Sequence, residues 1–155
     1  MFAVFPHALL SLILIGSIAP AMAQVVVRDA RVRGTVQWRM ATGAYMTLAS
    51  QEDLTLVGVT SDVAACAAVR EMRMRGDMTT RRPVESLPVP AGHPVMLDEG
   101  HYHVMLEGLR TLQAGETVGM DLQFVDSHGV RQVVHVNVAV REIAGHDSGA
   151  APHEM

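Results

Sequence analysis

The chain has 155 residues, with 12 basic and 16 acidic side chains and a formal net charge of −4, and every basic residue is arginine. This mild acidity argues against a nucleic-acid-binding protein, and a hydrophobic content of 49% excludes a wholly disordered chain. The single cysteine, Cys66, excludes an internal disulfide and a CxxC metal or redox site. The chain has 11 methionines and 8 histidines against one Trp, two Tyr and three Phe. The composition therefore predicts one small domain unusually rich in thioether and imidazole groups.

Residues 1–23 have the composition of an export signal. The stretch 9–23 is apolar and ends in Ala21-Met22-Ala23, which fits the small-x-small pattern of a cleavage site. The alternative is a retained membrane anchor, because the segment before the apolar stretch carries no Lys or Arg. We predict a cleaved signal peptide, a mature chain that begins at Gln24, and a periplasmic location.

The segment that follows the signal is predicted to be strand throughout. β-rich runs separated by Gly, Asp and Pro occupy residues 24–28, 30–38, 44–48, 54–60, 67–74, 93–97, 101–106, 117–125 and 130–140. Apolar residues alternate most clearly from 117 to 124, and the pattern returns from 134 to 140. Residues 63–69 alone suggest a turn of helix, in which Cys66 would be a small buried hydrophobe. Many short strands predict an all-β fold, an antiparallel β-sandwich over residues 24–143.

Residues 144–155 change to a polar composition and are predicted to form a disordered tail. This tail contains His146, His153 and Met155. We find no internal repeat and no second domain in the sequence.

Methionine and histidine concentrate in two segments, residues 70–78 and 101–105. Residues two apart share one face of a strand, so Met72 projects with Met74, and His101 projects with His103 and Met105. Thioether sulfur and imidazole nitrogen are ligands that select Cu(I) over hard cations. The alternative is ordinary packing, because methionine commonly fills irregular spaces in a core.

Several motifs carry a resemblance to a known family. They are Gly43-Ala44-Tyr45-Met46-Thr47-Leu48, Leu56-Val57-Gly58-Val59, Glu71-Met72-Arg73-Met74, Arg82-Pro83-Val84, Leu87-Pro88-Val89-Pro90-Ala91-Gly92, Gly100-His101-Tyr102-His103-Val104-Met105-Leu106 and Gly108-Leu109. Over residues 27–140 the chain resembles the periplasmic PCu(A)C copper chaperones. The resemblance implies a cupredoxin-like β-sandwich that holds Cu(I) and passes it toward cytochrome c oxidase assembly. It also implies a copper-accepting periplasmic partner, such as an oxidase subunit or another copper chaperone.

The metal-binding signature of that family is a His, ten residues, a Met, twenty-one residues, and then His-x-Met. His103 and Met105 match its closing half, whereas Arg81 stands at the Met position and Arg70 at the His position. A guanidinium stays protonated in proteins and cannot ligate copper. The predicted site is therefore His103, Met105 and Met72, completed by His101 or Met74.

Two further features have alternative interpretations. Five arginines lie between residues 70 and 82, and they form either a solvated strand face or an electropositive dock for an acidic partner. The tail residues His146, His153 and Met155 are candidates for weak Cu(II) binding, as the resemblance implies for metal-rich tails.

No catalytic constellation is visible in the sequence, which contains no Cys-His signature, no Gly-rich phosphate loop and no His-Glu-x-x-His. We therefore predict copper binding and delivery and no enzymatic activity. The alternative is a metal-independent protein-interaction module that keeps the fold with a degenerate copper site.

Overall fold

A computed structural model describes residues 24–36 and 38–142 of the chain. The predicted signal peptide, residues 1–23, and the predicted tail, residues 144–155, lie outside the described residues. Within the described ranges, no helix is long and apolar enough to cross a membrane.

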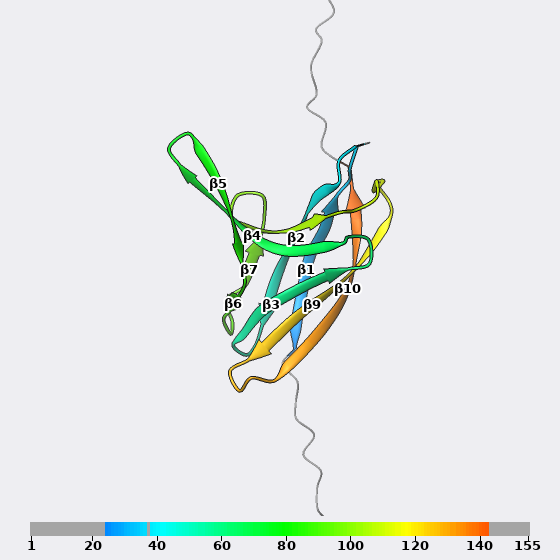
Figure 1. Cartoon of the computed structure of the whole chain (residues 1–155). Helices are drawn as coiled ribbons and strands as arrows, with labels where there is room; N and C mark the ends of the chain where they lie inside the picture. The colour runs from blue at the N-terminus through cyan, green and yellow to red at the C-terminus, as the bar shows by residue number, and fades with distance from the viewer. Residues whose placement is uncertain (1–23, 37, 143–155) are drawn as a thin grey trace, which may run out of the picture.

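Ten strands make up the described part of the chain (Figure 1). They are β1 (Val25–Arg33), β2 (Ala41–Ser50), β3 (Leu54–Ser61), β4 (Cys66–Arg75), β5 (Met78–Val84), β6 (Leu87–Val89), β7 (Val95–Leu97), β8 (Tyr102–Glu107), β9 (Thr117–Asp126) and β10 (Arg131–Arg141). The predicted all-β fold is confirmed.

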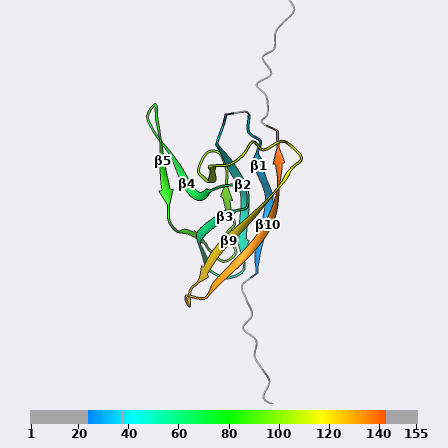
Figure 2. The same cartoon turned by 45° about the vertical axis from the view of Figure 1, so that its right-hand side comes forward.

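The strands form one continuous hydrogen-bonded sheet in the order β5-β4-β8-β7-β2-β1-β10-β9-β3-β6. In the two views of Figures 1 and 2, this sheet curves so that β3 and β9 lie across the core from β2 and β8. Most neighbours are antiparallel, as predicted, but β1 pairs in parallel with β10, and β7 in parallel with β8. The β1–β10 pairing joins the first and last strands and makes the two halves of the sandwich continuous.

The core lies between the two halves of the folded sheet. Every second residue of β9 is buried there, namely Val118, Met120, Leu122 and Phe124, so the alternation predicted for residues 117–124 is confirmed. In β10 only Val138 and Val140 are fully buried, while Val134 and Val136 pack against the edge of the core.

The first strand continues through a position where the sequence predicts a break. Asp29 was expected to separate strands at 24–28 and 30–38, but β1 runs without interruption from Val25 to Arg33. Asp29 adopts a positive φ of 52°, and the register with β2 shifts between Arg28 and Arg31. The turn-forming residue therefore makes a β-bulge within one strand.

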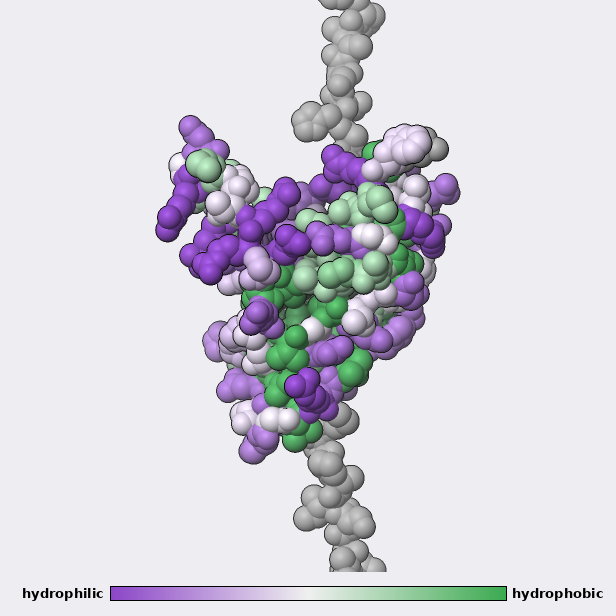
Figure 3. Space-filling view, in the orientation of Figure 1, coloured by the Kyte–Doolittle hydropathy of each residue, from purple (hydrophilic) through white to green (hydrophobic). Residues whose placement is uncertain are grey.

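Strands β4 and β5 form a hairpin that stands out from the sandwich (Figures 1 and 2). The expected helical turn over residues 63–69 is wrong, because β4 begins at Cys66, and Cys66 is exposed at the strand end. Strand β5 was not predicted, since all its residues except Val84 are exposed and show no alternation. In Figure 3 hydrophilic residues predominate on this hairpin, together with less polar ones, and Met74 and Met78 are exposed there.

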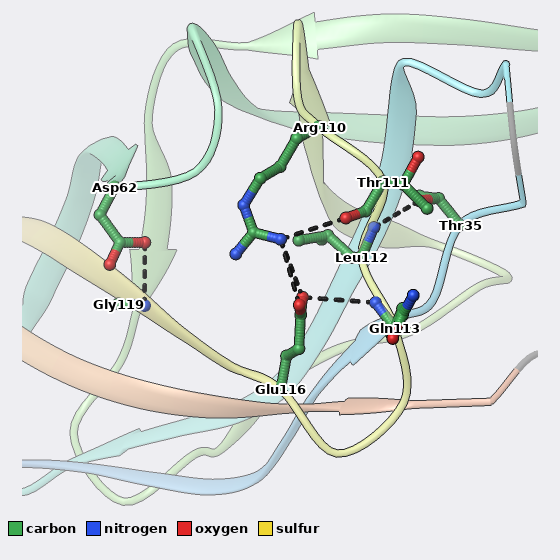
Figure 4. Close-up of polar contacts among 8 residues, drawn as sticks. All are labelled: Thr35, Asp62, Arg110, Thr111, Leu112, Gln113, Glu116 and Gly119. Carbon is green, nitrogen blue, oxygen red and sulfur yellow. Dashed lines mark hydrogen bonds and ion pairs between the residues drawn. The ribbon is translucent and has the colours of Figure 1, made fainter.

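The segment between β1 and β2 is fixed against the loop that follows β8. The amide of Leu112 donates to the Thr35 hydroxyl at 2.8 Å, and the amide of Gly108 donates to the Met40 carbonyl at 2.8 Å. The loop itself is held by the Arg110 guanidinium, which lies 3.1 Å from the Glu116 carboxylate (Figure 4). These contacts place residues 38–40 beside the outer face of β2 and β8.

Candidate metal centre

A pocket of about 560 Å³ opens on the outer face of β2, β8 and β4. It is lined by Arg33, Gly34, Trp38, Arg39, Met40, Ala41, Thr42, Gly43, Tyr45, Met72, Arg81, Glu99, His103 and Met105. Its lining therefore includes one imidazole and three thioethers, drawn from three separate segments of the chain.

Strand register explains why these side chains meet. His103 of β8 lies opposite Arg70 of β4, and Met72 of β4 lies opposite Arg81 of β5. Directly opposed residues in an antiparallel pair project from the same face of the sheet, and so do residues two apart in one strand. His103, Met105, Met72 and the two arginines therefore share the pocket face, while Val104 and Leu106 point into the core.

His103 is buried, with only 4% of its surface exposed, and within residues 24–36 and 38–142 its Nδ1 atom has no hydrogen-bond partner. Burial lowers the pKa of His103, and the positive charges of Arg81 and Arg70 lower it further. The ring is therefore held neutral, which is the form of histidine that binds a metal. A buried imidazole nitrogen without a partner at a pocket wall is available as a ligand.

This arrangement predicts a measurable titration. In a proton NMR titration of the metal-free protein, the midpoint of the His103 ring should lie below about 6.5, the ordinary value for histidine. Arg81→Gln should raise the midpoint, because it removes a cation that opposes protonation, whereas Arg82→Gln, on the opposite face of β5, should not. An unchanged midpoint in Arg81→Gln would show that Arg81 does not act on the ring.

The floor of the pocket is shaped by Tyr45 and Gly43 of β2. Tyr45 is buried, its ring centroid lies 6.5 Å from that of His103, and burial raises the pKa of its phenol. A Cβ atom at Gly43 would lie 2.5 Å from the Tyr45 hydroxyl, so only glycine leaves room for the phenol there. Gly43 also lies opposite Met105, and both residues line the pocket.

The predicted ligands divide into two groups in the structure. His103, Met105 and Met72 line the pocket together, and Met105 and Met72 are half-buried. Met74 and His101 do not line it: Met74 is 82% exposed, and His101 is exposed with its Nδ1 atom 3.5 Å from the Asp98 carboxylate. Their part in the site stays a prediction.

Met40 lines the pocket and was missed by the sequence analysis. It lies outside both methionine- and histidine-rich segments, immediately before β2, and its backbone carbonyl is fixed by the amide of Gly108. No local pattern marks it, because only the pairing of residues far apart in the chain brings it to His103.

Three arginines and one glutamate also line the pocket. Arg33 forms an ion pair with Glu99, and Arg70, opposite His103 on β4, lies 3.0 Å from Glu107. Arg81 forms no ion pair or side-chain hydrogen bond among the described residues. The pocket is therefore electropositive, and all of its candidate metal ligands except Glu99 are neutral.

The donor set restricts the metals that the pocket could hold. Within residues 24–36 and 38–142, no group of three or more His, Cys, Asp or Glu side chains is arranged to hold a metal. A metal in this pocket would instead use one imidazole and two or three thioethers. Such donors fit a soft monovalent cation and disfavour hard divalent ions.

Comparison with known proteins places the chain in a family. The family model described as "Putative lipoprotein LpqE-like" matches residues 25–140. A protein named "Putative lipoprotein Lxx21020", from Leifsonia xyli subsp. xyli, is 29% identical over 136 residues, which cover 81% of this chain and 80% of that protein.

Solved structures agree on the fold. The solution structure of CuI-DR1885 from Deinococcus radiodurans is 31% identical, with a TM-score of 0.59, and the match covers 79% of this chain and 83% of that chain. The copper-bound PCuAC domain from PmoF2 is 16% identical, with a TM-score of 0.59, and the match covers 77% of this chain and 93% of that chain. At this identity the similarity concerns the fold and not the function. The predicted resemblance to PCu(A)C proteins and the cupredoxin-like β fold are confirmed. The chain therefore belongs to the LpqE-like family and has the fold of PCuAC domains.

Proposed function

We propose that this protein binds Cu(I) in the pocket beside His103 and delivers it to a copper-accepting protein. The observation that carries the proposal is the buried His103 ring, whose Nδ1 atom has no hydrogen-bond partner among the described residues, in one pocket with the Met105 and Met72 side chains. His103, Met105 and Met72 would hold the ion, and Met40, which lines the same pocket, is one candidate for the position that these three leave open. His101 and Met74 remain candidates that would require movement of the strand end or the hairpin.

The similar proteins support copper as the cargo. Two of the similar solved structures are copper forms: CuI-DR1885 and the copper-bound PCuAC domain from PmoF2. Thioether ligands also avoid thiol oxidation and do not compete with protons, which suits a carrier outside the reducing cytoplasm.

The proposed setting is outside the cytoplasm. The sequence of residues 1–23 and the lipoprotein names of the family and its relative support export. The proposed partner is a periplasmic copper acceptor, such as a cytochrome c oxidase subunit or another copper chaperone. In this proposal the protein is a carrier, since it binds and releases its cargo without changing it. Weak Cu(II) binding is added by the tail residues His146, His153 and Met155.

A second candidate function is a protein-interaction module that needs no metal. The arginine side chains at the site favour this alternative. Arg70 lies opposite His103, and the charges of Arg70 and Arg81 both act on the His103 ring. Under this alternative, the arginines of the β4–β5 hairpin dock an acidic partner through charge complementarity.

A competition titration separates the two functions. The protein comprising residues 24–155 is titrated into a chromophoric Cu(I) chelator complex, anaerobically and with a reductant. The carrier proposal predicts that the protein withdraws one Cu(I) per chain and bleaches the chelator absorbance. No withdrawal at any protein excess would contradict copper binding and favour the interaction module.

A further inference from the structure

We propose that the pocket takes up Cu(I) together with a soft anion, chloride or a thiolate, which completes the coordination of the metal and faces Arg81. This inference rests on the proposed function and specifies its substrate as an anionic or neutral Cu(I) complex.

The first argument is the charge of the pocket. Three arginines and a single carboxylate line the pocket, and the thioethers carry no charge, so bound Cu(I) would add a positive charge to an already electropositive cavity. The two nearby carboxylates are already engaged, Glu99 by Arg33 and Glu107 by Arg70. An anion that arrives with the metal supplies the missing negative charge.

The second argument is the place of Arg81. It lies on β5 directly opposite Met72 and lines the same pocket as His103 and Met105. Among the described residues its guanidinium has no carboxylate partner. A guanidinium presents several N–H donors in a plane, and it is therefore suited to hold an anion beside the metal.

The third argument is that the side chains of the pocket leave one side of a bound Cu(I) ion without a ligand. One side of the pocket supplies His103 and Met105 from β8 and Met72 from β4, whereas the side formed by β5 supplies only Arg81. A ligand bound to Cu(I) on that side would lie between the metal and the guanidinium. Soft anions are chosen because Cu(I) prefers soft donors. Binding is simple coordination: the anion donates its lone pair, and copper remains Cu(I).

The test is the chloride dependence of Cu(I) exchange between the protein and a chromophoric chelator, at constant ionic strength maintained with perchlorate. Chloride in solution binds free Cu(I), but that equilibrium cancels in the exchange. If the protein complex contains one chloride, the exchange constant should rise about tenfold for each tenfold increase in chloride, by mass action. A parallel arm replaces chloride by glutathione and identifies a thiolate as the anion.

Two variants make the test specific. Arg81→Gln removes the cation without adding a soft ligand, and it should flatten the dependence on the anion. Arg82→Gln, the neighbouring arginine on the opposite face of β5, should keep it. An exchange constant independent of both anions, or an equal dependence in Arg81→Gln and the unmodified protein, would overturn the inference.

The outcome also separates this inference from the proposed function. Cu(I) binding that does not vary with either anion leaves the carrier function standing and removes the anion. Absence of Cu(I) binding at every concentration of chloride and glutathione removes both.

Discussion

Replacing His103 by alanine is expected to weaken Cu(I) binding by at least about 100-fold, because loss of a residue that only supports a metal ligand already costs 10- to 100-fold. The ring is the one nitrogen donor in the pocket, and it is held buried and neutral beside the thioethers. The measurement is the dissociation constant from competition with a chromophoric chelator.

The same assay ranks the methionines. Met105→Leu should also weaken binding strongly, and Met72→Leu moderately, because leucine keeps the volume and removes the sulfur, so the fold should survive. Parallel assays of Met40→Leu, Met74→Leu and His101→Ala identify which further donor completes the site. His93→Ala, an exposed histidine whose ring contacts the Ala91 carbonyl, is the matched control. Full affinity in both His103→Ala and Met105→Leu would place the metal elsewhere.

Replacing Phe124 by alanine is expected to lower the free energy of unfolding by about 3–5 kcal/mol, the usual cost of removing a buried phenylalanine side chain. Phe124 has no exposed surface and lies in β9, which is hydrogen-bonded to β10 on one side and β3 on the other. Urea denaturation followed by circular dichroism measures the change.

The control for this prediction is Val133→Ala on the adjacent strand. Val133 is 62% exposed, and it lies opposite Gln123, the residue that precedes Phe124. Truncation of Val133 should therefore change the free energy of unfolding by no more than about 0.5 kcal/mol. Equal destabilisation by the two substitutions would contradict the burial of Phe124 in the core.

The sequence predicts most reliably where one face of a strand is buried. In β9 the alternation of apolar and polar residues matches the observed burial, because the sheet has a distinct inner and outer face there. In β5 this cause is missing: the hairpin projects from the core, its residues meet water on both faces, and no alternation arises. At Asp29 the local turn preference is satisfied by a bulge, since pairing with β2 continues on both sides of it.

The candidate site also has one part that the sequence predicts and another part that it does not. His103, Met105 and Met72 lie in short segments where strand periodicity and chemistry together predict a shared face, and the structure places them in one pocket. Met40 and Arg39 are brought there by the hydrogen bond from Gly108 to the Met40 carbonyl, between residues that are distant in the sequence. Such a contact depends on the assembled sheet, so periodicity within a single segment does not reveal it.

The position of β5 at one end of the strand order has a consequence for self-association. An unpaired outer strand offers free N–H and C=O groups to another molecule, whereas the opposite end of the order, β6, is only three residues long and contains Pro88. Arg81, Arg82 and Pro83 interrupt β5 with two charges and a residue that lacks an amide hydrogen. Arg81, one of the three arginines that line the pocket, therefore also discourages strand-to-strand polymerisation, and Arg81→Met would add a thioether while weakening that protection.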